Sequence, residues 1–261
     1  MKNYIKRIIK VCVAILVFHI FTPMTLMAAE ESNVVNNYKY EILNKSSIVG
    51  QNKEDDFAVY FDDERVVFNY EFEDDSFKLT IKTDTETHSI TYNTNDNFMV
   101  MNGEIIPVEK NEIVIEDLSD NFSSNKVTPL YSWSPVFYTS GSVAVGRTVS
   151  TIGALATLIG GVIGVGILIN LNITQSEIAN KIGAWASAVS LGALVGGYYF
   201  DGAVTYSQYR TQTPVPDGGP SGMRQYAYRF QNVRAIGAIK GKTMNIELLN
   251  IGSWFFTQRP Y

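Results

Sequence analysis

Hydrophobic and polar side chains alternate over much of residues 57–108, and a period of two is typical of β-strands with one face in a core. From Val66 to Phe72, for example, every second residue is apolar or aromatic. Clusters of Asp, Asn and Thr separate such runs, and Asn102-Gly103 is a two-residue hairpin signal because both positions tolerate positive φ. We therefore predict an acidic antiparallel β-meander over residues 34–118.

The pattern changes to long apolar stretches farther along the chain. Residues 148–170 are 23 positions without a charged side chain, and residues 182–200 are 19 more. As a helix, each stretch would extend about 30 Å at roughly 1.5 Å per residue. Thr174-Gln175-Ser176-Glu177 lies between them and has the pattern of a capping box, with Thr174 and Glu177 at a helix start. We predict a glycine-rich antiparallel helical hairpin over residues 142–209.

Small residues recur in these stretches at the spacing of a helix repeat. Interior glycine costs a helix roughly 1 kcal/mol relative to alanine, so repeated glycine indicates that two helix backbones approach closely. The residues predicted to pack helix against helix are Gly153, Ala156, Gly160, Gly161, Gly164, Ala184, Ala188, Gly192 and Gly196. Such packing occurs between membrane-spanning helices, and the alternative is a hairpin that forms a soluble core.

Residues 148–200 resemble the glycine-zipper helices of membrane-active, bacteriocin-type proteins that Gram-positive bacteria secrete. The resemblance implies that the rows containing Gly160, Gly164, Gly192 and Gly196 insert into a lipid bilayer as transmembrane helices. Association of the hairpin with other copies of itself is a further partner that we consider. Aromatic residues at 133–138 and 198–200 would then lie together at one end of the hairpin, as an interfacial belt does.

The first 29 residues have the layout of a secretory signal peptide. Four basic residues precede an apolar run from Val11 to Phe21, and Ala28-Ala29 provides a small-residue exit. We predict cleavage near Ala29 and a secreted protein, with association with the membrane or the cell wall left open. Met27 is large for a position just before a cleavage site, so retention as an N-terminal anchor is the alternative.

Charge divides the chain into blocks. Residues 30–120 carry 22 acidic and seven basic side chains, whereas residues 121–261 carry four acidic and ten basic ones. We predict a linker over residues 119–141 and a basic, aromatic β tail over residues 210–261. Such a tail suits a lipid bilayer, an anionic envelope polymer or the chain's own acidic sheet. The acidic block and export both argue against nucleic acid as a partner.

Histidine and cysteine counts limit the chemistry. Cys12, the only cysteine, lies in the signal segment, and His88 is the only histidine beyond it. A mature chain would therefore have no disulfide, no thiolate metal site and no zinc site of several histidines. A lone strand histidine is far more often a surface or half-buried side chain than a catalytic base. No cofactor motif is present, and only a carboxylate-only hydrolase is left open.

Acidic turns provide a weak candidate for a calcium site. In a meander, alternate turns fall at the same edge, which would bring Asp55 and Asp56 near Asp74 and Asp75. The spacing matches no EF-hand loop, and charged turns usually serve only to keep sheet ends in water.

Together these patterns predict an α+β protein made of an antiparallel β-meander domain, a glycine-rich helical hairpin and a short C-terminal β segment. The leading functional hypothesis is an exported, non-enzymatic, membrane-active protein of bacteriocin-like or pore-forming character, which inserts its hairpin into a bilayer. The alternative is a secreted binding or structural module of the cell envelope, in which the hairpin is a soluble core.

Overall fold

The structure is a computed structural model that describes residues 39–43, 55–114, 132–169, 173–189, 197–218 and 222–256. The chain divides into two units, Met1–Asn36 and Asn37–Tyr261, and all of the described residues belong to the second. The signal-peptide segment of residues 1–29 and its expected cleavage site lie outside the described residues. Secretion therefore stays a prediction.

Eleven described strands form one antiparallel sheet, in the order β1 to β9 followed by β12 and β13. Neighbours in the chain are thus neighbours in the sheet, as expected for a meander. The strands are β1 (Tyr40–Ile42), β2 (Asp55–Phe61), β3 (Glu64–Glu73), β4 (Ser76–Lys82), β5 (Thr87–Asn93), β6 (Phe98–Met101), β7 (Glu104–Val114), β8 (Pro135–Val149), β9 (Tyr198–Thr211), β12 (Tyr228–Ile239) and β13 (Lys242–Ile251). A separate two-stranded ribbon joins β10 (Val215–Pro216) to β11 (Arg224–Gln225).

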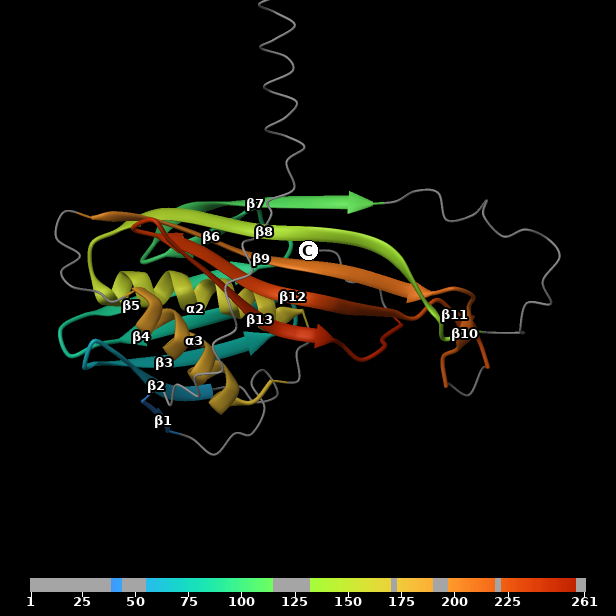
Figure 1. Cartoon of the computed structure of the whole chain (residues 1–261), viewed down its shortest axis with the longest axis horizontal. Coiled ribbons are helices and arrows are strands. Elements are labelled where there is room, and N and C mark those ends of the chain that lie inside the picture. The colour runs from blue at the N-terminus through green and yellow to red at the C-terminus, as the bar shows by residue number, and fades with distance from the viewer. Residues whose placement is uncertain are drawn as a thin grey trace, which may run out of the picture. The chain divides into compact units, whose positions relative to one another are not determined.

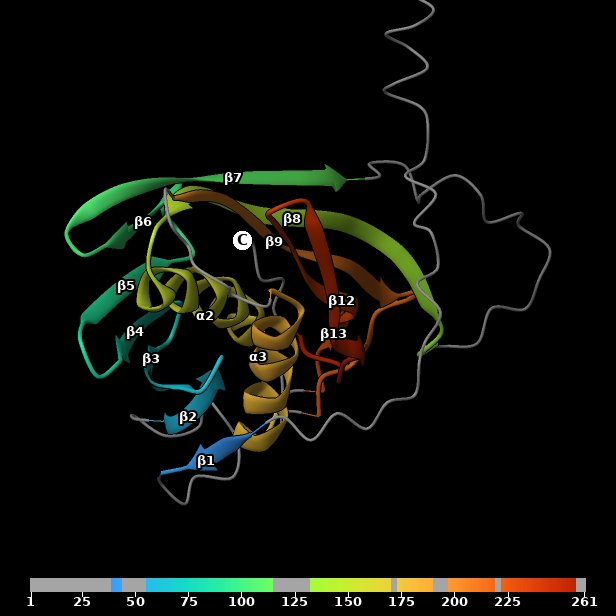
Figure 2. The same cartoon turned by 60° about the vertical axis from the view of Figure 1, so that its left-hand side comes forward.

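The sheet curls around one helix, α2 (Ile152–Leu168), and a second helix, α3 (Gln175–Val189), lies between the two ends of the sheet (Figures 1 and 2). Helix α2 packs against β3, β4 and β5 on one side and against β8, β9 and β12 on the other. Helix α3 packs against β1, β2 and β13. Of the 17 residues of α2, 15 are buried. The sheet therefore encloses α2 on several sides.

The predicted β-meander is present, but the predicted helical hairpin is wrong. Two long strands, β8 and β9, lie within or overlap the segments assigned to the linker and hairpin, and they pair with each other over residues 135–149 and 198–211. The apolar stretch of residues 182–200 contains the end of α3 and the start of β9. Both helices pack mainly against strands, so the fold is mostly β rather than a β domain followed by a helical one.

The transmembrane and glycine-zipper predictions are also wrong. Neither helix in the described part of the chain is long and apolar enough to cross a bilayer. Helix α2 is apolar on every face because strands surround it, and a helix enclosed by protein has the same composition as one enclosed by lipid. The sequence pattern alone could not distinguish these two surroundings.

The glycines of α2 make room for side chains of the sheet. A methyl group at Gly160 would collide with Leu79 Cδ2, and one at Gly164 would lie 2.8 Å from Cζ of Phe77. At Gly160 the buried Tyr70 hydroxyl donates a hydrogen bond of 2.8 Å to the helix carbonyl. Burial raises the pKa of Tyr70, which keeps this donor protonated. Glycine thus allows strands β3 and β4 to pack directly on the helix backbone.

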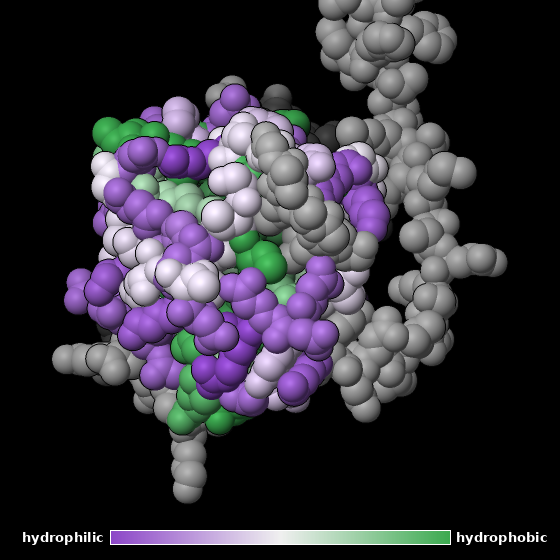
Figure 3. Space-filling view, turned by 90° about the vertical axis from the view of Figure 1, so that its left-hand side faces the viewer, coloured by the Kyte–Doolittle hydropathy of each residue, from purple (hydrophilic) through white to green (hydrophobic). Residues whose placement is uncertain are grey.

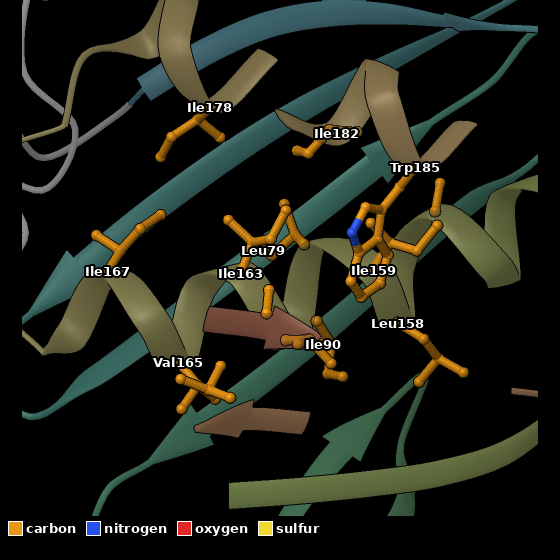
Figure 4. Close-up of a cluster of buried hydrophobic side chains, with 14 of the residues drawn as sticks. Leu79, Ile90, Leu158, Ile159, Ile163, Val165, Ile167, Ile178, Ile182 and Trp185 are labelled. Carbon is orange, nitrogen blue, oxygen red and sulfur yellow. The ribbon is translucent and has the colours of Figure 1, made fainter. Parts of the chain in front are cut away.

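Aliphatic side chains from both helices and from the sheet fill the space around α2. Figure 4 shows this cluster, with Ile159 and Ile163 from α2 beside Leu79 from β4 and Ile182 and Trp185 from α3. On the β2–β4 side the core is aromatic, with Phe57 stacked on Phe68 at 5.3 Å between ring centroids. All of these side chains are fully buried or nearly so.

A double-mutant cycle tests whether Gly160 packs on the sheet. We expect Gly160→Ala to destabilise the protein by about 1–3 kcal/mol, because the added methyl group overpacks the core. In a Leu79→Ala background the same change should cost much less, since the space has been vacated, which gives a coupling energy of about 0.5–3 kcal/mol. Urea unfolding of the four proteins measures it.

The control cycle combines Gly160→Ala with Leu248→Ala, because Leu248 contacts the position of Gly166, about 9 Å farther along the helix. These two changes should be additive. Additivity of Gly160→Ala and Leu79→Ala would contradict the helix-on-sheet packing.

Candidate binding surfaces at one end of the sheet

The residues predicted to pack helix against helix have other surroundings. Gly153, Gly160, Gly161 and Gly164 are buried in α2 and face side chains of the sheet or its turns. Ala156 is also buried in α2, and Ala184 is half-buried on α3. The side chain of Ala188 and all of Gly192 and Gly196 lie outside what the structure describes. The four described glycines therefore serve helix-on-sheet packing.

Thr174 and Glu177 make the hydrogen bonds of a capping box at the start of α3. The backbone N–H of Thr174 donates to Glu177 Oε2 at 2.8 Å, and the N–H of Glu177 donates to Thr174 Oγ1 at 3.3 Å. The Thr174 hydroxyl also donates to Glu177 Oε2 at 2.8 Å, and the two bonds to this carboxylate lower the pKa of Glu177. Their role is to satisfy helix-terminal donors, and they form no ligand site.

The acidic turns form no recognisable metal site in the described residues. Among those residues, no group of three or more acidic or histidine side chains could hold a metal ion. Asp56 accepts a hydrogen bond from Asn69 on the adjacent strand, whereas Asp74 and Asp75 form the turn between β3 and β4. The side chain of Asp55 lies outside the described set. These four residues carry no calcium proposal.

A groove of about 260 Å³ lies over strands β3 to β6. Its acidic residues are Glu71, Glu73 and Asp96, and Glu71 forms an ion pair of 3.0 Å with Lys78. This ion pair gives Glu71 a partner on the adjacent strand.

His88 is held by a chain of polar contacts at the start of α2. The N–H of Ser89 donates to Asn102 Oδ1 at 2.8 Å, so the Asn102 amide nitrogen faces His88 Nδ1, at 2.7 Å. Nδ1 then accepts, and the ring proton is on Nε2, which lies 2.9 Å from Glu86 Oε2. The other carboxylate oxygen of Glu86 accepts from the N–H of Gly153 at 3.1 Å.

This arrangement gives His88 a structural role. Both ring nitrogens face neighbouring side chains, and the network ends on a backbone N–H in the first turn of α2, where a carboxylate is stabilised by the helix dipole. A Cβ at Gly153 would lie 2.5 Å from Glu86 Oε1, so glycine is needed for this approach. Burial raises the pKa of Glu86, but the adjacent His88 ring and the hydrogen bonds from Thr151 and Gly153 outweigh it and lower the pKa overall.

A row of aromatic side chains crosses the outer face of the sheet where β8 begins and β9 ends. Figure 1 shows this end of the two strands on the right. Phe137, Tyr209 and Arg229 are cross-strand neighbours on β8, β9 and β12, and cross-strand partners share a face. Trp254 lies beside Arg229, and its ring is in contact with Trp133. The outer aromatic row is Trp133, Phe137, Tyr209, Arg229, Trp254 and Phe256.

The rings of the outer aromatic row are held at steep angles to one another. Phe137 and Tyr209 meet edge to face at 5.6 Å, and Trp133 meets Trp254 at 5.9 Å and 60°. The Arg229 guanidinium carbon lies 4.6 Å from the Trp254 ring centroid, within cation–π range. Trp133 is 42% exposed, and the other aromatic members are half-buried. The row is therefore ordered by its own contacts and accessible from solvent.

A second cluster lies on the inner face of the same end. Tyr138, Arg210, Tyr226, Tyr228 and Phe255 form it, and Tyr228 is the register partner of both Arg210 and Phe255. Because adjacent strand residues point to opposite faces, Arg210 faces inward while Tyr209 faces outward. Burial raises the pKa of Tyr228, and the neighbouring Tyr138 adds to this effect.

The expected aromatic belt is wrong, because β8 and β9 separate its members. The register pairs Pro135 with Thr211 and Val149 with Tyr198, so residues 133–138 and 198–200 lie at opposite ends of the two strands. The end that contains residues 198–200 faces the viewer in Figure 3 and is predominantly hydrophilic, with small apolar patches. The basic tail predicted over residues 210–261 includes β12, which pairs directly with β9.

Family models, curated proteins and solved structures were compared with this chain, and none of them matches it.

Replacing Glu86 tests the network at the start of α2. Its folded pKa lies below the ordinary value of 4.5, so its ionised form contributes stability that is present above pH 4.5 and lost as the pH falls through the folded pKa. We expect Glu86→Gln to cost about 1 kcal/mol at pH 7 and progressively less below pH 4.5. Urea unfolding at several pH values measures this.

Glu109→Gln is the matched control, because Glu109 is an exposed carboxyl on β7. Its effect should stay within about 0.5 kcal/mol at every pH. A Glu86→Gln cost that does not change with pH would contradict the role assigned to the carboxylate.

Proposed function

We propose that the protein is an exported, non-enzymatic binding module of the cell envelope, and that the outer aromatic row binds an anionic glycopolymer. The observation that carries the proposal is that aromatic side chains from β8, β9 and the C-terminal segment form one row with Arg229 in it. Tyr, Trp and Arg are the residues most enriched at the centres of binding surfaces.

The shape of the row supports an extended ligand. Phe137, Tyr209, Arg229 and Trp254 succeed one another across the strands, and neighbouring strands are about 4.8 Å apart, so the row is roughly 14 Å long. Aromatic faces offer apolar contact area to sugar rings, and a planar guanidinium pairs with carboxylate or phosphate in two-pronged geometry. A polymer lying across the strands would contact the aromatic rings and the guanidinium one after the other.

The recessed rings favour such a polymer over a bilayer. Apart from Trp133, the aromatic members of the row are half-buried and packed on one another. Contact with a bilayer interior calls for apolar side chains that protrude, and anionic lipid contributes roughly 1 kcal/mol per basic residue near its surface. The row has one such residue, Arg229. The apolar helix α2 adds nothing to this surface, because it is buried in the core.

Removing an aromatic ring from the row should weaken binding. We expect Trp133→Ala to raise the Kd for an immobilised anionic polysaccharide, polygalacturonate, about tenfold, because Trp133 contacts both Trp254 and Phe256. Tyr199→Ala is the control, since Tyr199 is 62% exposed at the opposite end of β9, and it should bind as the wild type does. Biosensor titrations of the full chain, with neutral dextran as a blank, measure both.

Equal affinity of the Trp133→Ala and wild-type chains would show that the outer aromatic row is not the binding site for the polymer. Binding to phosphatidylglycerol vesicles without binding to the polymer would identify a lipid surface as the partner instead.

A change of charge within the row tests the anionic nature of the ligand. Arg229→Gln should weaken polymer binding and reduce its dependence on salt, because one charge contact is lost. Arg234→Gln removes the same charge from the outer face of the same strand, where Arg234 bonds to Asn245 and lies 3.5 Å from Glu247. It should leave the salt dependence unchanged. Identical salt dependence in both variants would exclude Arg229 as the anion contact.

A further inference from the structure

Two buried donors remain unused on the inner face of β9. Gln208 is 2% exposed, and neither its Nε2 nor Nε of Arg210 has a hydrogen-bond partner among the described residues, although both atoms are buried. The two residues are separated by one position on a strand, so they share a face. An unsatisfied buried donor typically costs about 1–3 kcal/mol, and native proteins contain few of them.

Aromatic rings enclose the Arg210 guanidinium. Its central carbon lies 4.4 Å from the ring centroid of Tyr226 and 5.9 Å from that of Tyr138. Tyr228 lies opposite Arg210 in the sheet, and Phe255 packs against Tyr228. These rings lower the local dielectric, which strengthens any charge interaction made by the guanidinium.

The charges on neighbouring strands are mixed. Glu112 on β7 accepts a hydrogen bond of 3.2 Å from Thr139 Oγ1, and Thr139 is the register partner of Gln208. Lys110, two residues earlier on β7, donates to the carbonyl of Thr94, and burial lowers its pKa. Glu112 is thus an acidic group near the two donors, one strand removed from Gln208.

We propose that Gln208 and Arg210 form a binding site for an oxyanion, a carboxylate or a phosphate. Both unused atoms are donors, so the missing partner is an acceptor, and the guanidinium adds a positive charge that selects an anion. A planar guanidinium suits the paired oxygens of these groups. The Cα atoms of the two residues are about 6.7 Å apart at roughly 3.35 Å per strand residue, so one oxyanion can receive bonds from both.

This site is independent of the proposed function, because it lies on the inner face of the sheet and uses none of the residues of the outer aromatic row. The oxyanion can be a free ion or a group carried by a larger ligand, and both share the same chemistry.

The test measures the Tm of the full chain against increasing sodium phosphate or sodium acetate, with sodium chloride keeping the ionic strength constant. We expect Tm to rise with the oxyanion concentration, because a ligand that binds only the folded state stabilises it. Gln208→Met should raise the Tm without anion, since it removes an unsatisfied buried donor, and should lose at least half of the oxyanion-dependent rise.

Arg210→Lys keeps the positive charge but loses the planar guanidinium, and it should also lose most of the oxyanion-dependent rise in Tm. Glu112→Gln removes the nearby negative charge and should increase the oxyanion-dependent rise in Tm. Arg234→Lys is the control, because Arg234 lies on the outer face near Asn245 and Glu247, and it should respond as the wild type does.

A rise with phosphate alone would identify a phosphate site, and a rise with both ions would identify a general oxyanion site. An equal rise with chloride, or an undiminished rise in Gln208→Met, would overturn the proposal. Phosphorus NMR provides a measurement on the wild-type chain that needs no variant. Broadening of the phosphate signal supports the site, and an unchanged line in phosphate overturns it for that ion.

Discussion

The fold depends on the burial of one helix that has no polar face. On a flat sheet, α2 would leave about half of its apolar surface in water, and that surface would cost roughly 25 cal/mol for each Å² exposed. The observed sheet curls so that β3–β5 and β8, β9 and β12 pack against the same helix. Glycines at the contact points allow the sheet to approach, as Gly160 does with Leu79 and Tyr70. The curl of the sheet and the glycines of α2 therefore both serve to bury this helix.

A curled sheet with two free ends needs a third element to close its core. In the described structure, β1 and β13 are the terminal strands, and α3 packs against both of them. Its apolar side directs Ile178, Ile182 and Trp185 into the core. Lys181 donates a hydrogen bond to the carbonyl of Glu247 on β13, which satisfies a polar group at an edge that would otherwise invite pairing with another chain. Burial against the edge of the sheet lowers the pKa of Lys181.

Local sequence patterns predicted the β-meander but not which elements pack against it. The alternation from Val66 to Phe72 and the Asn102-Gly103 turn each depend on neighbouring residues, and the structure contains both as β3 and the β6–β7 turn. By contrast, Tyr70 and Gly160 are 90 positions apart, so no local pattern identifies what the glycines contact. The aromatic residues of the outer row are visible in the sequence, but their convergence depends on the register of β8, β9 and β12. Unsatisfied donors such as Gln208 Nε2 have no sequence signal, because burial depends on the whole fold.

The position of both candidate surfaces follows from the unequal lengths of α2 and the strands around it. Near the end of α2, the position of Gly166 contacts Leu248 and lies close to Val204, whereas β9 continues to Thr211, about 23 Å beyond Val204 at roughly 3.3 Å per residue. Inward-facing residues past that point have no helix to pack against. Polar Gln208 and Arg210 therefore lie on the inner face there, and aromatic residues rather than α2 cover them. Because these residues do not pack against α2, side chains at this end can differ without disturbing the packing around the helix, and the cost of the two unsatisfied donors stays local.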